Sequence, residues 1–242
     1  MWKIKNLKTS AKAVLKENYW LAFLVSVILW LISGGGGIYA NIGANYSNGF
    51  MPDTETEFAP FFLAFFIIIV VLGVLIGLAF NILLKYPLEV GTARYFIEEQ
   101  RYAFDLNNLG FAFNGSRYLD IVKAMLWRAF LTFLWFLLLI IPGIIAIYAY
   151  RMTPYILADN PNIGYKRAVK LSVQMTRGHK FRIFLLDLSF LGWLLLGFLL
   201  LFVGVLFVWP YINATYAELY VTLRQLALDK GLCTDEELLI AS

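Results

Sequence analysis

Four ionisable side chains lie inside stretches that are otherwise apolar, and their types and positions make them the best candidates for chemistry. They are Arg128, Arg151, Asp187 and Glu218. An unpaired charge within a bilayer costs on the order of a few kcal/mol, so these side chains should face a helix bundle and pair. We expect Arg151 to pair with Asp187, and Arg128 with Glu218. The exchanged pairing is also compatible with the sequence.

Two interpretations of these four charges remain open. They could form a polar site, open to the cytoplasmic side, that binds an anionic headgroup or a coupled proton. Alternatively, they could be structural ion pairs that fix the register of the helices, since two acids and two bases neutralise each other.

The sequence offers no catalytic motif beside these charges. We find no HExxH metalloprotease motif, no GxSxG elbow, no phosphate loop and no CDP-alcohol transferase carboxylate pattern. The single histidine, His179, argues against a His-rich metal site, and the single cysteine, Cys233, against an intrachain disulfide. We therefore expect no enzymatic activity, no bound metal and no cofactor.

Composition places the chain in the membrane. Hydrophobic residues make up 61% of the 242 residues and charged residues 15%, against about 45–50% and about 25% in soluble domains. Mean hydropathy is +0.72 and the isoelectric point about 9.0. The basic residues flank apolar stretches, where they would meet phospholipid headgroups rather than nucleic acid. These features predict an all-α integral membrane protein.

The apolar stretches predict six transmembrane helices in a single domain of residues 1–242, arranged as three hairpins. The expected spans are 19–34, 61–84, 118–141, 143–160, 181–201 and 204–223. Turns between paired spans are expected at Pro142-Gly143 and near Gly204. Each hairpin should be preceded or followed by short segments at the membrane surface.

Lysine and arginine indicate the orientation. The segment 33–60 contains neither residue, whereas the N-terminal segment, 85–117 and 161–182 contain several. By the positive-inside rule, 33–60 is an extracellular loop, and the connections 85–117 and 161–182 are cytoplasmic. Both termini, including the tail 225–242, are cytoplasmic as well. The loop is rich in Gly and Asn, which is typical of a flexible connection, although a substrate lid is an alternative.

Two segments, 1–18 and 161–180, show the pattern of basic amphipathic helices. In the second, one face carries Ala168, Leu171, Ser172 and Met175. Such helices lie on the anionic cytoplasmic leaflet, with their basic residues at the headgroups. The expected lipid contacts are Lys5, Lys8, Lys12, Lys16, Lys166, Arg167, Lys170 and Arg177.

Gly73, Gly77 and Asn81 follow one another at four-residue spacing in the second span. Small residues at this spacing allow close helix approach in membranes. The face could pack within the monomer or form a homodimer seam, so the oligomeric state stays open.

A weak internal repeat is visible. Pro154-Tyr-Ile-Leu-Ala-Asp matches Pro210-Tyr-Ile-Asn-Ala-Thr, and Pro87-Leu-Glu-Val-Gly-Thr is a looser copy. The pattern favours three units, each a surface helix followed by a two-span hairpin. Chance similarity between apolar sequences is the alternative.

The stretches KYPLEVGTARYF, TPYILADNPNIGYKRAVKLSVQMTRGHKFRIFLLDLSFLGW and WPYINATYAELY resemble an uncharacterised family of multi-pass membrane proteins. That family occurs mainly in Gram-positive bacteria and is named only as a domain of unknown function. It is similar to the membrane domain that precedes the catalytic barrel of some glycerophosphodiester phosphodiesterases. The resemblance implies a six-span fold in the bacterial plasma membrane and no known activity.

These observations favour a non-enzymatic membrane component that binds anionic lipid or a partner membrane protein, for example an accessory subunit. The alternative is a transporter or lipid flippase that uses the buried charges. A cavity lined by those charges would favour transport, and a solid bundle with an exposed groove would favour binding.

Overall fold

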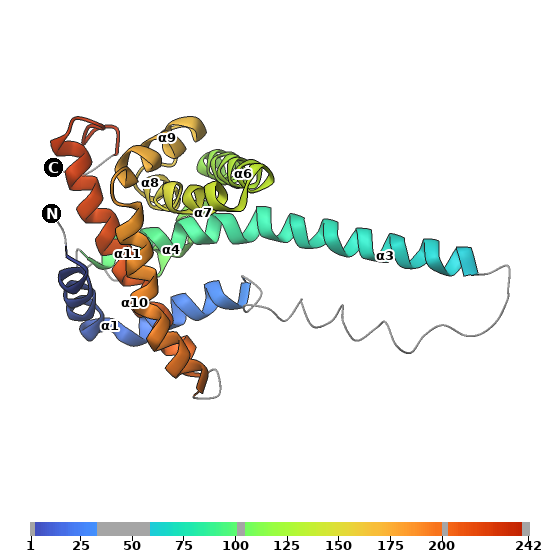
Figure 1. Ribbon diagram of the computed structural model, residues 1–242, viewed down its shortest axis with the longest axis horizontal. Coiled ribbons are helices and arrows are strands. Elements are labelled where there is room, and N and C mark those ends of the chain that lie inside the picture. The colour runs from blue at the N-terminus through green and yellow to red at the C-terminus, as the bar shows by residue number, and fades with distance from the viewer. Residues whose placement is uncertain (1–2, 33–58, 101–104, 200–202, 239–242) are drawn as a thin grey trace.

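The computed structural model describes residues 3–32, 59–100, 105–199 and 203–238. The described residues form helices joined by turns and short loops, and they contain no strand (Figure 1). The predicted extracellular loop 33–60 lies outside the described residues except for its last two positions.

The described helices follow one another along the chain in two halves. The first half contains α1 (Ile4–Ile32), α3 (Ala59–Phe80), the π-helix η1 (Asn81–Lys85), α4 (Tyr86–Glu99), α5 (Asn107–Gly110) and the 3-10 helix η2 (Phe111–Phe113). The second half contains α6 (Gly115–Leu138), α7 (Ile140–Ala149), α8 (Thr153–Asp159), α9 (Tyr165–Thr176), α10 (Lys180–Leu199) and α11 (Val203–Asp229).

Three helical segments are long and apolar enough to cross a membrane. They cover Ala64–Glu99, Arg117–Leu138 and Ile140–Asp159. A continuous apolar helix satisfies its own backbone hydrogen bonds, which is what the bilayer interior requires. The chain is therefore an all-helical membrane protein.

The apolar helix α3 extends away from the rest of the molecule (Figure 1). Its side chains from Ala64 to Phe80 are all exposed. A Cβ atom added at Gly73 or Gly77 would meet nothing within 4 Å, and the Asn81 amide donates to the Gly77 carbonyl of its own helix at 2.8 Å. Packing of this face within the monomer is therefore wrong for the described residues.

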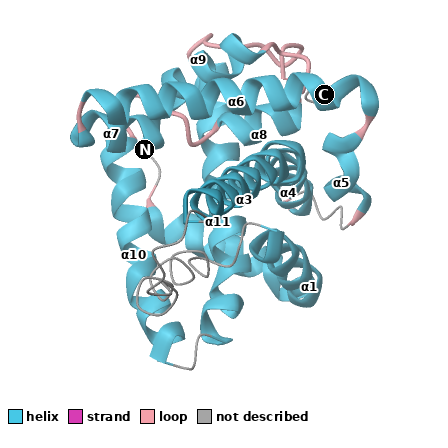
Figure 2. Cartoon of the chain, turned by 90° about the vertical axis from the view of Figure 1, so that its right-hand side faces the viewer, coloured by secondary structure: helices cyan, strands magenta, loops and turns pink. Residues whose placement is uncertain are grey.

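Helix α4 is at the centre of the molecule. We expected residues 85–117 to be a cytoplasmic connection, but α3 continues through η1 into α4, whose residues Val90, Tyr95 and Phe96 are buried. Pro87 lies directly after the π-helix η1, where the regular hydrogen bonding of the continuous helix is already interrupted. Figure 2, which looks along α3, places α6 to α9 above α4 and α1 below it.

Other helix boundaries also differ from the predicted spans. Helix α1 is continuous through the boundary expected near residue 18, and α11 continues six residues beyond the expected end at 223, to Asp229. The expected span 143–160 is broken at 150–152 into α7 and α8. The turn before it lies at Leu139, with φ −164° and ψ 151°, rather than at Pro142-Gly143.

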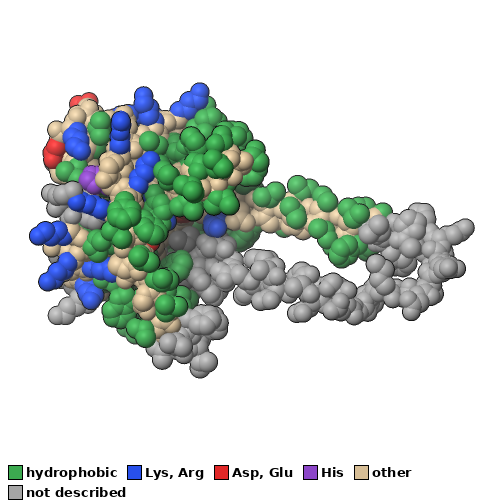
Figure 3. Space-filling model, in the orientation of Figure 1, with side chains coloured by type: hydrophobic (Ala, Val, Ile, Leu, Met, Phe, Trp, Pro, Cys, Tyr) green, Lys and Arg blue, Asp and Glu red, His purple; other side chains and the backbone are tan. Residues whose placement is uncertain are grey.

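Charged and apolar side chains occupy different regions of the surface. Lysine and arginine gather on the left and upper sides in Figure 3, around the N-terminal part of α1 and around α9. Hydrophobic side chains cover α3 and the end of the α6–α7 pair on the right. This separation is typical of a protein that is partly immersed in lipid.

Candidate functional site: a charged cavity between four helices

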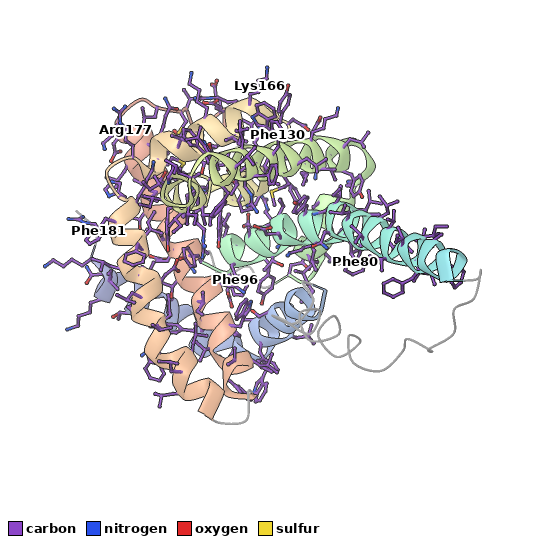
Figure 4. All side chains as sticks on the ribbon, turned by 45° about the vertical axis from the view of Figure 1, so that its right-hand side comes forward. Phe80, Phe96, Phe130, Lys166, Arg177 and Phe181 are labelled. Atoms are coloured by element: carbon purple, nitrogen blue, oxygen red, sulfur yellow. The ribbon has the colours of Figure 1, made fainter. Side chains whose placement is uncertain are left out.

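A cavity of about 400 Å³ lies where α4, α8, α10 and α11 meet. Its polar wall is formed by Lys85, Glu89, Thr92, Arg151, Asp187 and Asn213. Its apolar wall includes Phe96, Phe190, Leu194, Trp209 and Ile212. Figure 4 shows Phe96 in the interior, where α4 meets α1 and α11.

The break between α7 and α8 positions Arg151 at this cavity. The Ser172 hydroxyl on α9 donates to the carbonyl of Ala149 at 2.8 Å and accepts from the backbone N–H of Met152 at 3.2 Å. The Thr176 hydroxyl lies 3.2 Å from the same Ala149 carbonyl and 2.9 Å from the Ser172 carbonyl of its own helix, which is its nearer acceptor. These bonds satisfy backbone groups that the broken helix leaves free, so the position of Arg151 is fixed by α9.

Arg151 pairs with Asp187, as predicted. The guanidinium Nη2 lies 3.7 Å from the Asp187 Oδ1 atom, and the guanidinium stacks over the Tyr216 ring at 4.2 Å. The Tyr216 hydroxyl donates a hydrogen bond to the same carboxylate oxygen. Asp187 on α10 and Tyr216 on α11 therefore hold the arginine from two sides.

The predicted pair of Arg128 with Glu218 is wrong. The Arg128 guanidinium on α6 instead binds both carboxylate oxygens of Glu89, at 2.9 and 3.3 Å. Glu218 forms a side-chain hydrogen bond with Ser10 of α1 and does not line the cavity.

Glu89 and Lys85 were missed because the second span was expected to end at residue 84. A helical continuation places both residues on one face, because they are four positions apart, and carries them into the bundle. The signal was present in the sequence as two charges: Lys85 precedes the loosest copy of the internal repeat by two positions, and Glu89 lies within it.

The cavity carries a surplus positive charge. Lys85, Arg151, Glu89 and Asp187 lie in the cavity wall, and Arg128 is ion-paired to the wall residue Glu89. Together they supply three positive charges and two negative charges. Lys85 forms no ion pair within the described part of the chain. The surplus is the charge of Lys85, which was not among the four charges considered from the sequence, and it makes the site suited to an anion.

A second buried ion pair lies outside the cavity and is structural. The Arg224 Nη1 atom lies 2.8 Å from the Asp159 Oδ2 atom, and the Tyr220 hydroxyl donates to that oxygen at 2.5 Å. Arg94 on α4 donates to the adjacent Ala158 carbonyl at 2.9 Å. Side-chain contacts from α4 and α11 thus fasten the C-terminal end of α8.

The amphipathic pattern of α9 is confirmed, but its apolar face packs on protein rather than on lipid. The predicted apolar residues Ala168, Leu171, Ser172 and Met175 are buried. Lys166, Lys170 and Arg177 are exposed, and Figure 4 shows Lys166 and Arg177 pointing outward. Their contact with lipid headgroups stays a prediction.

Arg167, which we expected to contact lipid headgroups, binds groups of the protein instead. Its Nε and Nη2 atoms bind the Glu237 carboxylate at 2.6 and 2.9 Å, and Nη2 also donates to the Leu232 carbonyl at 2.7 Å. This hydrogen bonding lowers the pKa of the Glu237 carboxyl. The segment after α11 is thereby fixed to α9 instead of forming a free tail.

The described lysines of α1 also differ in whether they are exposed or bound to protein. Lys5 and Lys12 are exposed, whereas the Lys8 Nζ atom donates to the Ser189 carbonyl at 3.3 Å and lies 4.3 Å from the centre of the Phe190 ring. Lys8 therefore joins α1 to α10. The side chain of Lys16 lies outside the described residues.

The described lining of the cavity indicates which kind of ligand would fit it. Its carboxylates are engaged with arginines, and the described residues contain no group of three His, Cys, Asp or Glu side chains able to hold a metal ion. A cationic polar wall opposite an aromatic wall suits a ligand with an anionic head and an apolar body.

Comparison with known proteins places this site within a family. No curated protein and no solved structure matches the chain. Residues 61–227 match the family described as "Protein of unknown function (DUF975)", and this stretch contains every residue of the cavity wall. The chain belongs to this family of proteins of unknown function.

Proposed function

We propose that the protein is a non-enzymatic membrane component that binds an anionic amphiphile, such as a phospholipid, in the cavity between α4, α8, α10 and α11. The observation that carries this proposal is Lys85, a cation at the cavity wall without an ion-pair partner among the described residues. A headgroup phosphate would neutralise Lys85 and accept its hydrogen bonds.

The rest of the cavity fits such a ligand. Arg151 is held by Asp187 and Tyr216 and needs no rearrangement to accept a second anion at its free guanidinium edge. Phe190, Trp209 and the other apolar wall residues would cover the start of an acyl chain.

We further propose the topology that the sequence predicts: six spans in three hairpins, in a bacterial plasma membrane, with both termini cytoplasmic. The gathering of cations around α9 and the N-terminal part of α1 supports this orientation (Figure 3). Likeness to the membrane domain of glycerophosphodiester phosphodiesterases belongs to the same proposal. Exposed Lys166, Lys170 and Arg177 would contact anionic headgroups, and α3 would face lipid or a partner membrane protein.

Native mass spectrometry of the full chain released from nanodiscs tests the binding proposal. The nanodiscs contain phosphatidylglycerol and phosphatidylcholine. The wild type should retain phosphatidylglycerol, and Lys85→Gln should lose most of it. The matched control is Lys170→Gln, which removes an exposed lysine outside the cavity and should keep the lipid. Equal retention by all three proteins would reject the cavity as the binding site.

A transporter or lipid flippase is the second candidate. The cavity favours it, because two of the four predicted charges, Arg151 and Asp187, line that cavity. The surrounding helices also favour it, because α4 and α8 carry Pro87 and Pro154 in their first turns and α11 contains Pro210. Interrupted helices around a central site are common in transporters. Movement of a fluorescent phosphatidylglycerol between leaflets of proteoliposomes, abolished by Arg151→Leu, would favour this alternative over simple binding.

A further inference from the structure

One acid on α4 is buried without a partner. Glu99, the last residue of α4, is completely buried, and neither of its carboxylate oxygens has a hydrogen-bond partner within the described part of the chain. Buried polar groups are normally hydrogen-bonded, and each exception calls for an explanation. Asp159 shows the normal case in this fold, because it binds both Arg224 and Tyr220.

Two further buried hydroxyl groups without hydrogen-bond partners among the described residues lie on the face of α4 that carries Glu99. The Tyr95 hydroxyl and the Thr92 hydroxyl are buried and also lack partners among the described residues. Residues 92, 95 and 99 share one face of α4, because they are spaced by three and four positions. Thr92 lines the cavity, and Glu99 lies about 10 Å further along the helix axis. Two buried hydroxyl groups thus share the face of α4 that carries Glu99 toward the cavity.

Within the described part of the chain, no cation pairs with Glu99. The Tyr95 hydroxyl interacts electrostatically with Glu99. The described charged groups of the helices packed against α4 are exposed or engaged elsewhere. On α1, Lys5 and Lys12 are exposed and Lys8 binds Ser189; on α11, Glu218 binds Ser10 and Arg224 binds Asp159. On α6, Arg128 binds Glu89, Lys123 pairs with Asp120, and Arg117 lies over Phe111. An isolated carboxylate in such a site is strongly disfavoured relative to the neutral acid.

We propose that Glu99 is a proton-binding site that exchanges its proton with the cavity past Tyr95 and Thr92, so that anion binding in the cavity is coupled to proton uptake. On release, the O–H bond of the carboxyl breaks, the proton passes to water in the cavity, and a carboxylate remains; uptake is the reverse. The coupling follows from charge: a neutral Glu99 preserves the positive potential of the cavity, whereas a carboxylate weakens anion binding. The coupling, but not the proton site itself, rests on the proposed function of the cavity.

Infrared difference spectroscopy of the purified full chain tests the proton site directly. Titration between about pH 6 and about pH 10 should reveal a protonated-carboxyl band that Glu99→Gln removes. Glu98→Gln, which changes the neighbouring acid that pairs with Arg94, should retain the band. A Glu99→Gln spectrum identical to that of the wild type would overturn the proposal.

The coupling is tested by the rise in melting temperature that short-chain phosphatidylglycerol produces. In the wild type this rise should be several-fold larger at about pH 6 than at about pH 9, where lysines are still charged, and in Glu99→Gln it should be the same at both. Glu98→Gln should behave as the wild type. A rise in the wild type that is independent of pH would overturn the coupling alone. Absence of any rise would reject the cavity function, while the infrared band would still decide on the proton site.

Discussion

Arg128 on α6 and Glu89 on α4 form a two-point ion pair, with nitrogen–oxygen distances of 2.9 and 3.3 Å. The pair joins α6 to the helix that continues from α3, and its side chains are only 21% and 29% exposed. It also neutralises Glu89, so that the neighbouring Lys85 remains the uncompensated charge at the cavity. This contact therefore determines both how α6 packs on α4 and that the net charge of the cavity is positive.

Removing one partner of this ion pair should destabilise the folded protein. Glu89→Ala leaves the Arg128 guanidinium largely buried without its acid and should lower the free energy of unfolding by about 3 kcal/mol. The measurement is denaturant unfolding in detergent. Asp120→Ala is the control, because Asp120 pairs with Lys123 at 3.9 Å on the surface and should cost less than about 1 kcal/mol. Similar losses in both variants would contradict a special role for Glu89.

The buried pair of Asp159 and Arg224 should behave as a coupled unit. Asp159→Asn or Arg224→Met alone should destabilise the protein by about 3–5 kcal/mol, because each leaves a buried charge. The double variant should recover part of this loss, which a double-mutant cycle measures. Strictly additive losses would show that the two side chains do not interact.

Acid should release the segment after α11 from α9. The folded-state pKa of Glu237 is below its unfolded value, because Arg167 binds the carboxylate. The stability from this contact is therefore present above the unfolded pKa and is lost as pH falls through the folded pKa, below about pH 5. Hydrogen exchange of residues 230–238, corrected for the intrinsic rate, should rise in this range. In Glu237→Gln the rise should be absent, and a normal rise there would assign it to another group.

Glycine is required where α10 and α11 touch. A Cβ atom at Gly197 would lie 2.7 Å from the Val205 backbone nitrogen, so Gly197→Ala must separate the two backbones and should cost about 1–3 kcal/mol. The matched control is Gly192→Ala on the same helix, where a Cβ atom would meet nothing within 4 Å. Thermal unfolding of both variants in the same detergent makes the comparison. Equal midpoints would refute the close contact.

Part of the site could be predicted from the sequence and part could not. Arg151 and Asp187 stand out because a charge in an apolar stretch is costly, and their pairing follows from that cost. The partner of Arg128 could not be predicted, because Glu89 is apparent as a buried acid only once α3 is known to continue into α4. Glu99 was missed for the same reason.

The sequence by itself determined that this is a helical membrane protein with a basic amphipathic helix near residues 165–176. Composition and a 3.6-residue pattern are local properties, and they depend on no distant contact. Only the tertiary structure decided whether each helix face contacts protein or is exposed. The apolar face of α9 packs on protein because α6 and α8 cover it, Arg167 binds Glu237, and Lys85 remains unpaired beside Glu89 and Arg128. Burial and pairing depend on residues brought together from distant parts of the chain, and a linear pattern does not specify which residues these are.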